Sequence, residues 1–433
     1  MHSQQPHYVV ITAGTTGDVH PFIRIAKSFQ AIGRRVTFIT HTFHAKLLHG
    51  SGLTFVGFGT EEEYLRIIQD PNIWHPRRGF SALLASYGDQ LLQLDSAIRS
   101  TLSDGPVVLI AHPLTVPGAA IARDQALVSQ IVSMHLAPST LRTCRDPLRV
   151  GEMTVPKWVP MSWRRAYWRF VEKGWVDPVA LAQTNQARRA LGLLDVRSSF
   201  LAHIEEVPNL TVTLFPSWFG PTMPDWPQPM INADFQLFDS ASGESFSPEL
   251  HKFIDAGERP LVFTPGTGNL HANRFFSCAL AAAANLGQRA ILLTRERSQF
   301  PAELPSSVLW QPYVPLAGLL PRVKALVHHG GVGTTAEAFR AATPQLVTPF
   351  AWDQFDNAAR VEELGAGVVL RASRVSARRF TNALRHLITS QEIHSRCQQI
   401  SRQFSRRSDS SELCREIEAN VLSRMNLSAA STA

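Results

Sequence analysis

The stretch Leu326–Asn357, LVHHGGVGTTAEAFRAATPQLVTPFAWDQFDN, predicts a strand, a glycine-rich turn, a helix, a second strand and a polar loop. The short apolar run at 325–327 is strand-like. Three glycines within residues 330–333 cannot continue that strand and mark a turn. The segment 334–342 then predicts a helix, which ends before Pro344 and the next strand. This order is typical of an α/β domain with a parallel sheet.

The glycine-rich turn has the features of an anion site. Glycines allow close backbone approach, and the free N–H groups at the start of a helix, together with its dipole, favour negative charge. Thr334 and Thr335 add hydroxyl donors, and His329 adds an imidazole N–H. The spacing matches neither the dinucleotide fingerprint nor the Walker loop. A diphosphate site and a plain strand-to-helix turn are therefore the two alternatives for this segment.

The polar loop after the second strand favours the ligand-binding alternative. Asp353 and Gln354 place a carboxylate and an amide side by side, next to Trp352. Such a pair can hold neighbouring hydroxyl groups of a sugar. The loop also follows a strand, where open α/β sheets bind their ligands.

In order and spacing, this stretch resembles the nucleotide-sugar signature of the UDP-glycosyltransferase superfamily, glycosyltransferase family 1, and the resemblance extends over nearly the whole chain. It implies an α/β fold of the GT-B type, with two Rossmann-like domains whose parallel sheets face a central cleft. The donor contacts that it implies are a diphosphate set (His329, Gly331, Gly333 and Thr334), a ribose contact (Glu337) and a pair for sugar hydroxyls (Asp353 and Gln354).

A second strand–turn–helix unit opens the chain, with a strand at 8–12, a turn at 14–21 and a helix at 22–32. In the superfamily this turn carries an Asp or His, three residues before a proline, that is the catalytic base. The resemblance therefore implies Asp18 as the base. The alternative for Asp18 is the N-cap of the following helix, a position that Asp favours.

Two neighbours of Asp18 are further candidates. His20 is a lesser catalytic candidate that orients Asp18 or lines the pocket, and Thr16 is a donor contact. The candidates for the acceptor pocket lie further along the same half of the chain. They are Trp74, Phe80 and Leu83 in an irregular aromatic stretch, with His112 and His135 at the ends of two later strands. For both histidines the alternative is an ordinary loop residue.

The second half begins with a strand at 260–264 and a turn at 265–268. The superfamily has a donor-phosphate contact at such a turn, which the resemblance places at Thr267 beside Gly266. It also implies an aromatic residue against the nucleotide base, and Trp310 and Tyr313 compete for this role. The predicted organisation is an acceptor domain (1–238), a linker and entry segment (239–258), a nucleotide-sugar domain (259–409), a helix returning to the first domain (410–425) and a disordered tail (426–433).

Composition limits the class of protein. A chain of 433 residues that is 44% hydrophobic can form two globular domains. The start of the chain lacks an apolar leader, and no run of 18 apolar residues occurs, so a cytoplasmic protein is expected. Four scattered cysteines predict free thiols. The net charge of +7 fits an anionic small ligand or membrane surface and is weak evidence for nucleic acid.

Two segments of the first half stand out. Trp158–Trp175 mixes tryptophans with arginines and predicts either a helix lying on a membrane surface or one packing its aromatics into the first domain. The proline-rich run Pro224–Pro229 is similar to the rhamnosyltransferase of rhamnolipid synthesis, as are Asp70-Pro71 and Gly17-Asp18-Val19.

These observations predict an inverting glycosyltransferase that moves a hexose to a hydroxyl of a lipophilic acceptor, such as a hydroxy fatty acid lipid, polyketide or flavonoid. No Asp-x-Asp motif occurs, so neither metal nor cofactor is expected. The expected partners are a nucleotide sugar and the acceptor, without nucleic acid. Glu337, which the resemblance places at the ribose, and His329 favour UDP-glucose over dTDP-rhamnose as the sugar donor. The alternatives are a sugar-nucleotide epimerase on the same fold and a non-catalytic protein that binds a nucleotide or lipid.

Overall fold

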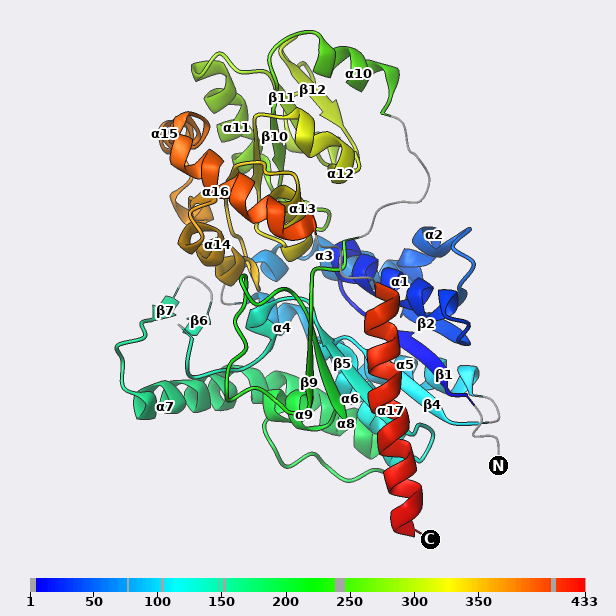
Figure 1. The fold of residues 1–433 in the computed structure, drawn as a ribbon. Helices are drawn as coiled ribbons and strands as arrows, with labels where there is room; N and C mark the ends of the chain where they lie inside the picture. The colour runs from blue at the N-terminus through cyan, green and yellow to red at the C-terminus, as the bar shows by residue number, and fades with distance from the viewer. Residues whose placement is uncertain are drawn as a thin grey trace.

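The computed structural model describes residues 5–75, 78–102, 105–146, 148–150, 153–237, 246–405 and 410–432. The chain forms two α/β domains, one above the other in Figure 1, each built on a parallel sheet. The predicted fold class is therefore confirmed. In the described part of the chain, no helix is long and apolar enough to cross a membrane.

The first sheet has seven strands in the order β3-β2-β1-β4-β5-β8-β9, all parallel. Its central strands are mostly apolar and are buried at every position, as expected where helices cover both sides of a sheet. The strands are β1 (His7–Ile11), β2 (Val36–His41), β3 (Thr54–Phe58), β4 (Val107–Ala111), β5 (Gln130–His135), β8 (Leu210–Leu214) and β9 (Met230–Ala233). An antiparallel hairpin, β6 (Leu148–Val150) and β7 (Met153–Val155), stands apart from the sheet.

The helices of this domain alternate with its strands. They are α1 (Thr16–Ala31), α2 (Ala45–Leu48), α3 (Glu61–Gln69), α4 (Gly79–Leu83), α5 (Tyr87–Thr101), α6 (Val116–Asp124), α7 (Met161–Val171), α8 (Ala182–Ala190) and α9 (Phe200–Glu206). A π-helical segment, Glu172–Leu181, joins α7 to α8.

The second sheet has six parallel strands in the order β12-β11-β10-β13-β14-β15. The strands are β10 (Leu261–Thr264), β11 (Ala290–Leu293), β12 (Val308–Gln311), β13 (Ala325–His328), β14 (Gln345–Val347) and β15 (Gly367–Val369). The helices are α10 (Pro248–Asp255), α11 (Asn273–Asn285), α12 (Leu316–Leu319), α13 (Val332–Arg340), α14 (Gln354–Glu363), α15 (Ala377–Thr389) and α16 (Gln391–Ser401).

Both sheets reverse their strand order at one point. In the first sheet this switch lies between β1 and β4, and in the second between β10 and β13. Open α/β sheets bind ligands in the crevice beyond the carboxyl ends of the strands at such a point. The loops that carry Asp18, Gly266 and His329 all leave these strands, so the topology directs them to a ligand site.

The C-terminal helix α17 (Ser410–Thr432) runs back along α1 of the first domain (Figure 1). Leu413, Cys414 and Ile417 are buried in the first domain's core. Glu418 accepts hydrogen bonds from Tyr8 Oη (3.3 Å) and Arg34 Nη2 (2.8 Å). The bounds of α17 include most of the segment from residue 426 for which the sequence predicts a disordered tail.

The predicted linker and entry segment, 239–258, is described in part. Residues 239–245 lie outside the described residues, but the second part of the predicted segment forms helix α10, whose N-cap Ser247 accepts from Leu250 N. The strands of the two sheets fall on either side of residues 239–258.

A buried ion-pair network holds the domains together. Arg149 of β6 pairs with Asp356 of α14 at 2.6 Å and with Glu363. From the other side, Arg360 of α14 pairs with Asp146 of the first domain at 2.6 Å and also binds Asp356. Because a buried charge that loses its partner is costly, this network favours one relative position of the two domains.

Candidate active site between the two domains

A cavity of about 900 Å³ lies between the two domains. It is lined by the loops that follow β1, β4, β10, β13 and β14, together with α4 and α13. The predicted site residues that line it are Thr16, Asp18, His20, Trp74, Phe80, Leu83, His112, Gly266, Thr267, Tyr313, His329, Gly331, Gly333, Thr334, Glu337, Asp353 and Gln354. Residues predicted from opposite halves of the chain therefore meet at one cavity.

Two predicted residues lie elsewhere. Trp310 packs against the second domain's core and donates from Nε1 to Thr294 O (2.8 Å), so Tyr313 is the aromatic of the competing pair that lines the cavity. His135 is fully buried at the end of the interior strand β5. Its Nδ1 donates to Thr140 Oγ1 (2.9 Å), and burial lowers its pKa to about 3. It is a core histidine and does not line the pocket.

Asp18 occupies the first turn of α1, which begins at Thr16, six residues earlier than predicted. The N-cap is Thr15, and Asp18 is the N3 residue of the same capping box. Asp18 Oδ2 accepts hydrogen bonds from Thr15 N (2.7 Å) and Thr15 Oγ1 (3.1 Å). Both bonds fall on Oδ2, so this structural role does not use Oδ1. The capping and cavity-lining roles of Asp18 therefore coexist.

Gly14 makes room for this carboxylate. Its φ is +125°, and a Cβ there would lie 2.4 Å from Asp18 Oδ2. The carbonyl of Gly14 accepts from His44 Nε2 (3.0 Å) and Tyr64 Oη (3.3 Å). These bonds fix the turn that presents Asp18. The sequence analysis missed His44 and Tyr64, which lie 30 and 50 residues further along the chain.

The histidines around Asp18 are uncharged at neutral pH. Burial, with His44 and Arg295 nearby, lowers the pKa of His20 to about 4. Burial also lowers the pKa of His112, although Asp18 opposes this shift. Neutral imidazoles can donate a hydrogen bond without cancelling a charge on Asp18.

The two adjacent histidines of the organising stretch have different roles. His328 is buried within the sheet, where Gly330 N donates to its Nδ1 (3.1 Å) and its Nε2 donates to Gln345 Oε1 (2.9 Å). These bonds stabilise the turn. His329 lines the cavity.

Glycines flank the imidazole of His329 on two sides. A Cβ on Gly331 would lie 2.5 Å from His329 Nε2, and one on Gly266 would lie 2.8 Å from the same atom. Gly266 also has φ of +91°. These two glycines therefore admit the imidazole itself, a role that the turn pattern did not predict.

His329 and the start of α13 together form a candidate anion cradle. Burial lowers the pKa of His329 to about 4, so the imidazole is neutral and carries one N–H. Among the described residues its buried Nδ1 has no hydrogen-bond partner. The cap of α13 is Gly331, and the first N–H groups of a helix lack intrahelical partners. These donors and the helix dipole suit a phosphate.

Glu337 lies on the second turn of α13, at the cavity wall. Its side chain is 12% exposed, and Arg340 Nη2 lies 2.6 Å from its Oε2. The structure therefore places Glu337 against the cavity and away from the outer surface.

The loop after β14 is held by amides. Phe350 N (2.9 Å) and Ala351 N (3.1 Å) both donate to Gln354 Oε1. Asn357 Nδ2 donates to Asp353 Oδ2 (2.8 Å) and to Gly330 O (2.9 Å). Asn357, which the sequence analysis passed over, therefore links the predicted sugar contact to the anion cradle.

Asp353 has a strongly perturbed environment. Burial, with Asp18 across the cavity as the second cause, raises the pKa of Asp353 to about 7. Trp352 beside it has a φ of +61°, a strained value for a bulky residue. Perturbed carboxylates and backbone strain cluster at functional sites.

The cavity extends deep into the first domain as an apolar chamber. Its walls there include Leu84 at the C-cap of α4, Leu91 of α5, and Phe200 and Ile204 of α9. Arg142 also lines the cavity and bridges the buried carboxyl groups of Glu172 and Glu205. These walls are contributed by elements far apart in the sequence.

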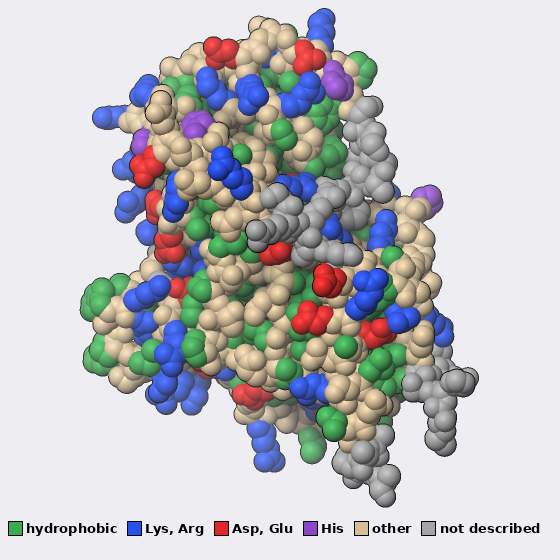
Figure 2. Space-filling model, in the orientation of Figure 1, with side chains coloured by type: hydrophobic (Ala, Val, Ile, Leu, Met, Phe, Trp, Pro, Cys, Tyr) green, Lys and Arg blue, Asp and Glu red, His purple; other side chains and the backbone are tan. Residues whose placement is uncertain are grey.

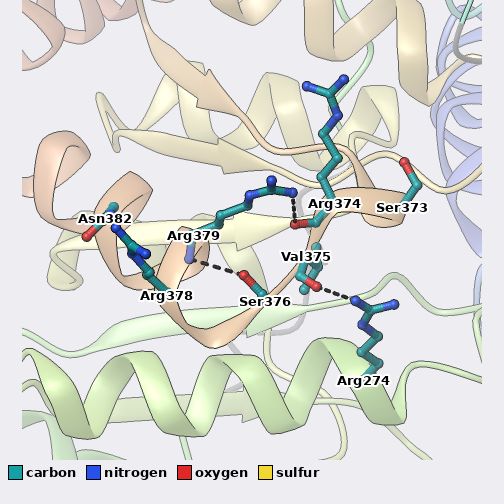
Figure 3. A pocket seen from close by; sticks show the side chains of 8 residues that line it. All are labelled: Arg274, Ser373, Arg374, Val375, Ser376, Arg378, Arg379 and Asn382. Atoms are coloured by element: carbon teal, nitrogen blue, oxygen red, sulfur yellow. Dashed lines mark hydrogen bonds between the residues drawn. The ribbon is translucent and has the colours of Figure 1, made fainter.

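A second, smaller hollow lies on the outer side of the second domain (Figure 3). It is lined by Arg274, Ser373, Arg374, Val375, Ser376, Arg378, Arg379 and Asn382. Arg274 donates to Val375 O (2.7 Å) and Arg379 to Arg374 O (3.3 Å). It contains no predicted catalytic residue. Among the described residues, no group of three or more His, Cys, Asp or Glu side chains could hold a metal ion.

Two family models match separate parts of the chain. Residues 8–119 match the glycosyltransferase family 28 N-terminal domain. Residues 277–419 match the C-terminal domain of erythromycin biosynthesis protein CIII-like proteins. The first model is named for family 28, whereas the sequence resemblance pointed to family 1, so the level shared by both is the superfamily.

Curated relatives are named glycosyltransferases. A sterol 3-beta-glucosyltransferase of Debaryomyces hansenii is 26% identical over 91% of this chain and 26% of its own length. An O-mycaminosyltylonolide 6-deoxyallosyltransferase of Streptomyces fradiae is 27% identical over 82% of this chain and 83% of its own. The chain spans about a quarter to a third of the sterol enzymes that it matches.

The solved structure of the glycotransferase of kitacinnamycin superposes with a TM-score of 0.72 at 19% identity, covering 96% of this chain and 100% of that one. At this identity the likeness concerns the fold. The two matched models and the two facing parallel-sheet domains together indicate a GT-B protein of the UDP-glycosyltransferase superfamily.

Proposed function

We propose that this protein transfers a hexose, with inversion, from a nucleotide-diphosphate sugar to a hydroxyl of a lipophilic acceptor. One observation carries the proposal. Asp18 of the first domain and Asp353, His329 and the start of α13 of the second line one cavity. A base, a sugar contact and a diphosphate cradle are thereby brought together.

Asp18 is the proposed general base. Two hydrogen bonds from Thr15 to its Oδ2 fix the orientation of the carboxylate. Asp18 accepts the proton of the acceptor hydroxyl as that oxygen attacks the anomeric carbon, on the face opposite the diphosphate. Base assistance of this kind contributes roughly 10²- to 10⁴-fold.

The second domain stabilises the leaving nucleoside diphosphate. Negative charge develops on the departing oxygen, and the N–H groups of α13, Thr334 and His329 are arranged to meet it. Preorganised donors are effective because they need no rearrangement during the reaction. This arrangement needs no metal, so transfer is expected to continue in excess chelator.

UDP-glucose remains the proposed donor, with dTDP-rhamnose as the second choice. Glu337 can accept hydrogen bonds from two vicinal ribose hydroxyls, whereas deoxyribose offers one. The names of the sterol relatives specify glucose, which supports a hexose of that type. Solved structures of the same fold include complexes with thymidine diphosphate. Measured affinities for UDP and dTDP would therefore decide which nucleotide this protein prefers.

The acceptor is proposed to be a hydroxylated apolar molecule. The chamber beside Asp18 is lined mainly by apolar side chains of the first domain. Sterol and macrolide names among the relatives agree with this chemistry.

One assay tests the proposal. The protein is incubated with UDP-glucose or dTDP-rhamnose, with and without a sterol or a hydroxy fatty acid. Acceptor-dependent release of the nucleotide supports a transferase. Interconversion of the sugar without acceptor would instead indicate an epimerase, and binding without either reaction would indicate a non-catalytic protein.

A further inference from the structure

Large apolar side chains are exposed on one short segment of the first domain. Of the eight that are exposed in the described part of the chain, five lie within residues 153–175. They are Met153 (46% exposed), Trp158 (82%), Trp163 (72%), Phe170 (62%) and Trp175 (45%). Aromatic side chains bury a large apolar area when they enter an interface. This exposed group is therefore a candidate binding surface.

Basic side chains surround these aromatics. Lys157, Arg165, Arg169 and Lys173 are all exposed, and α7 contains no acidic residue. The acid that follows α7, Glu172, is buried and paired with Arg142. Figure 2 shows apolar and basic side chains together at its lower left, where Figure 1 places α7.

The helix cannot turn its aromatics inward. Arg164 is buried and donates to Val159 O and Cys144 O, both at 2.9 Å. Trp168 Nε1 donates to Thr143 O at 2.8 Å. These bonds fix the inner face of α7, so Trp163 and Phe170 remain on the outside. Arg164 is therefore an anchor of α7 and cannot meet a membrane.

The same segment forms part of the cavity wall. Trp168 and Val171 line the apolar chamber, as does Val176 immediately after the segment. A single layer of protein therefore separates the exposed aromatic–basic face from the proposed acceptor site.

We propose that residues 153–175 dock on an anionic lipid bilayer and so place the acceptor chamber next to membrane lipid. The second part rests on the proposed function, whereas docking does not. Aromatic residues with Lys and Arg are typical of helices that lie in the membrane interface. A symmetric contact between two copies would bring Lys157, Arg165, Arg169 and Lys173 against like charges, which charge complementarity disfavours.

Vesicle co-sedimentation tests the docking. Vesicles of phosphatidylcholine alone are compared with vesicles that also contain phosphatidylglycerol, at low and high salt. Binding should require the anionic lipid and weaken with salt. Each basic residue near such a surface contributes roughly fivefold to binding, so Arg165→Glu with Arg169→Glu should reduce it roughly twentyfold or more.

A matched pair of variants controls for net charge. Arg378→Glu with Arg379→Glu makes the same change at the hollow of Figure 3 and should leave vesicle binding within about twofold of wild type if docking is local. Trp163→Ala with Phe170→Ala should weaken binding without changing the melting temperature, since both side chains are exposed. Equal losses in the two arginine pairs would overturn the proposal.

A measurement of the oligomeric state could contradict the membrane-docking proposal. If wild type is a dimer that Trp163→Ala with Phe170→Ala makes monomeric, and vesicles are not bound, the face is a protein interface and the proposal is wrong. Transfer to a water-soluble acceptor should be equal in wild type and the Arg165→Glu, Arg169→Glu variant. Loss of transfer in both would count against the proposed function and leave the docking result valid.

Discussion

The side-chain amide of Asn357 donates to the carbonyl oxygen of Gly330 over 2.9 Å, and so joins helix α14 to the loop that follows β13. The same nitrogen lies 2.8 Å from Asp353 Oδ2. One buried group thereby fixes the distance between the turn proposed to hold the diphosphate and the loop proposed to hold the sugar.

Replacing Asn357 by Ala should therefore disturb both parts of the donor site. The Gly330 carbonyl and Asp353 would lose a buried partner, at a cost of about 1–3 kcal/mol in the free energy of unfolding. We expect a higher KM for the nucleotide sugar and a lower melting temperature. Asn420→Ala, at a partly exposed residue of α17, is the control and should change neither. An unchanged KM in Asn357→Ala would show that the tie does not position the donor.

Asp18→Asn should reduce transfer by roughly 10²- to 10⁴-fold while leaving nucleotide affinity near normal. The amide oxygen can still accept from Thr15 N, so the capping box is kept, but the amide cannot take a proton. Glu63→Gln is a close control, because Glu63 completes the same kind of capping box with Thr60 on α3 and does not line the cavity. Full turnover in Asp18→Asn would remove Asp18 from the role of base.

His329→Ala should weaken nucleotide-sugar binding and turnover together. A hydrogen bond to a charged phosphate contributes about 1.5–3 kcal/mol, which corresponds to roughly tenfold to a hundredfold in affinity. Calorimetry with UDP measures the change. Gly331→Ala should act in the same direction, because its Cβ would displace the imidazole. Gly257→Ala, where a Cβ meets only ordinary contacts, should bind as wild type does. If His329→Ala keeps its affinity, the imidazole does not contact the diphosphate.

The pH dependence of donor binding should report Asp353. With its pKa raised to about 7, this carboxyl is protonated below that pH and ionised above it. The ionised form accepts stronger hydrogen bonds from sugar hydroxyls. The affinity for UDP-glucose, relative to that for UDP, is therefore expected to rise between about pH 6 and about pH 8.

For stability the sign is opposite. The folded protein holds the Asp353 proton more tightly than the unfolded chain, whose carboxyl has a pKa of 3.8. The contribution of Asp353 to the free energy of unfolding should fall as pH rises from about 4 toward about 7. Asp353→Asn should flatten both profiles, and Asp18→Asn should move the midpoint to lower pH. A binding profile that is the same in wild type and Asp353→Asn would contradict this assignment.

Glu337→Leu should reduce UDP affinity more than dTDP affinity. The carboxylate can accept from both ribose hydroxyls of UDP, and a lost hydrogen bond to a charged group costs about 1.5–3 kcal/mol. Glu392→Leu, on the exposed surface of α16, controls for the loss of charge and should leave both affinities unchanged. Equal UDP and dTDP binding in wild type would restore dTDP-rhamnose as the leading donor.

The local pattern of the chain already indicated its two parallel-sheet domains and part of the candidate donor site. Glycines at a strand end, a helix that starts directly after them and a polar loop after the next strand are all close in sequence, and local backbone sterics produce the turn. For this reason His329 and Asp353 could be named from the local pattern, whereas Asp18 and Glu337 were named through the family resemblance. The structure places all four at one cavity.

The tertiary structure alone decided the features that depend on contacts between distant parts of the chain. Periodicity does not show that Gly266 packs against His329 or that Arg149 pairs with Asp356, since each pair joins separate elements. The same holds for Trp310 and Tyr313, three residues apart, of which packing turns one to the core and leaves the other at the cavity. Whether an aromatic of α7 is buried or exposed likewise depends on Arg164, whose carbonyl partners are presented by the surrounding loops.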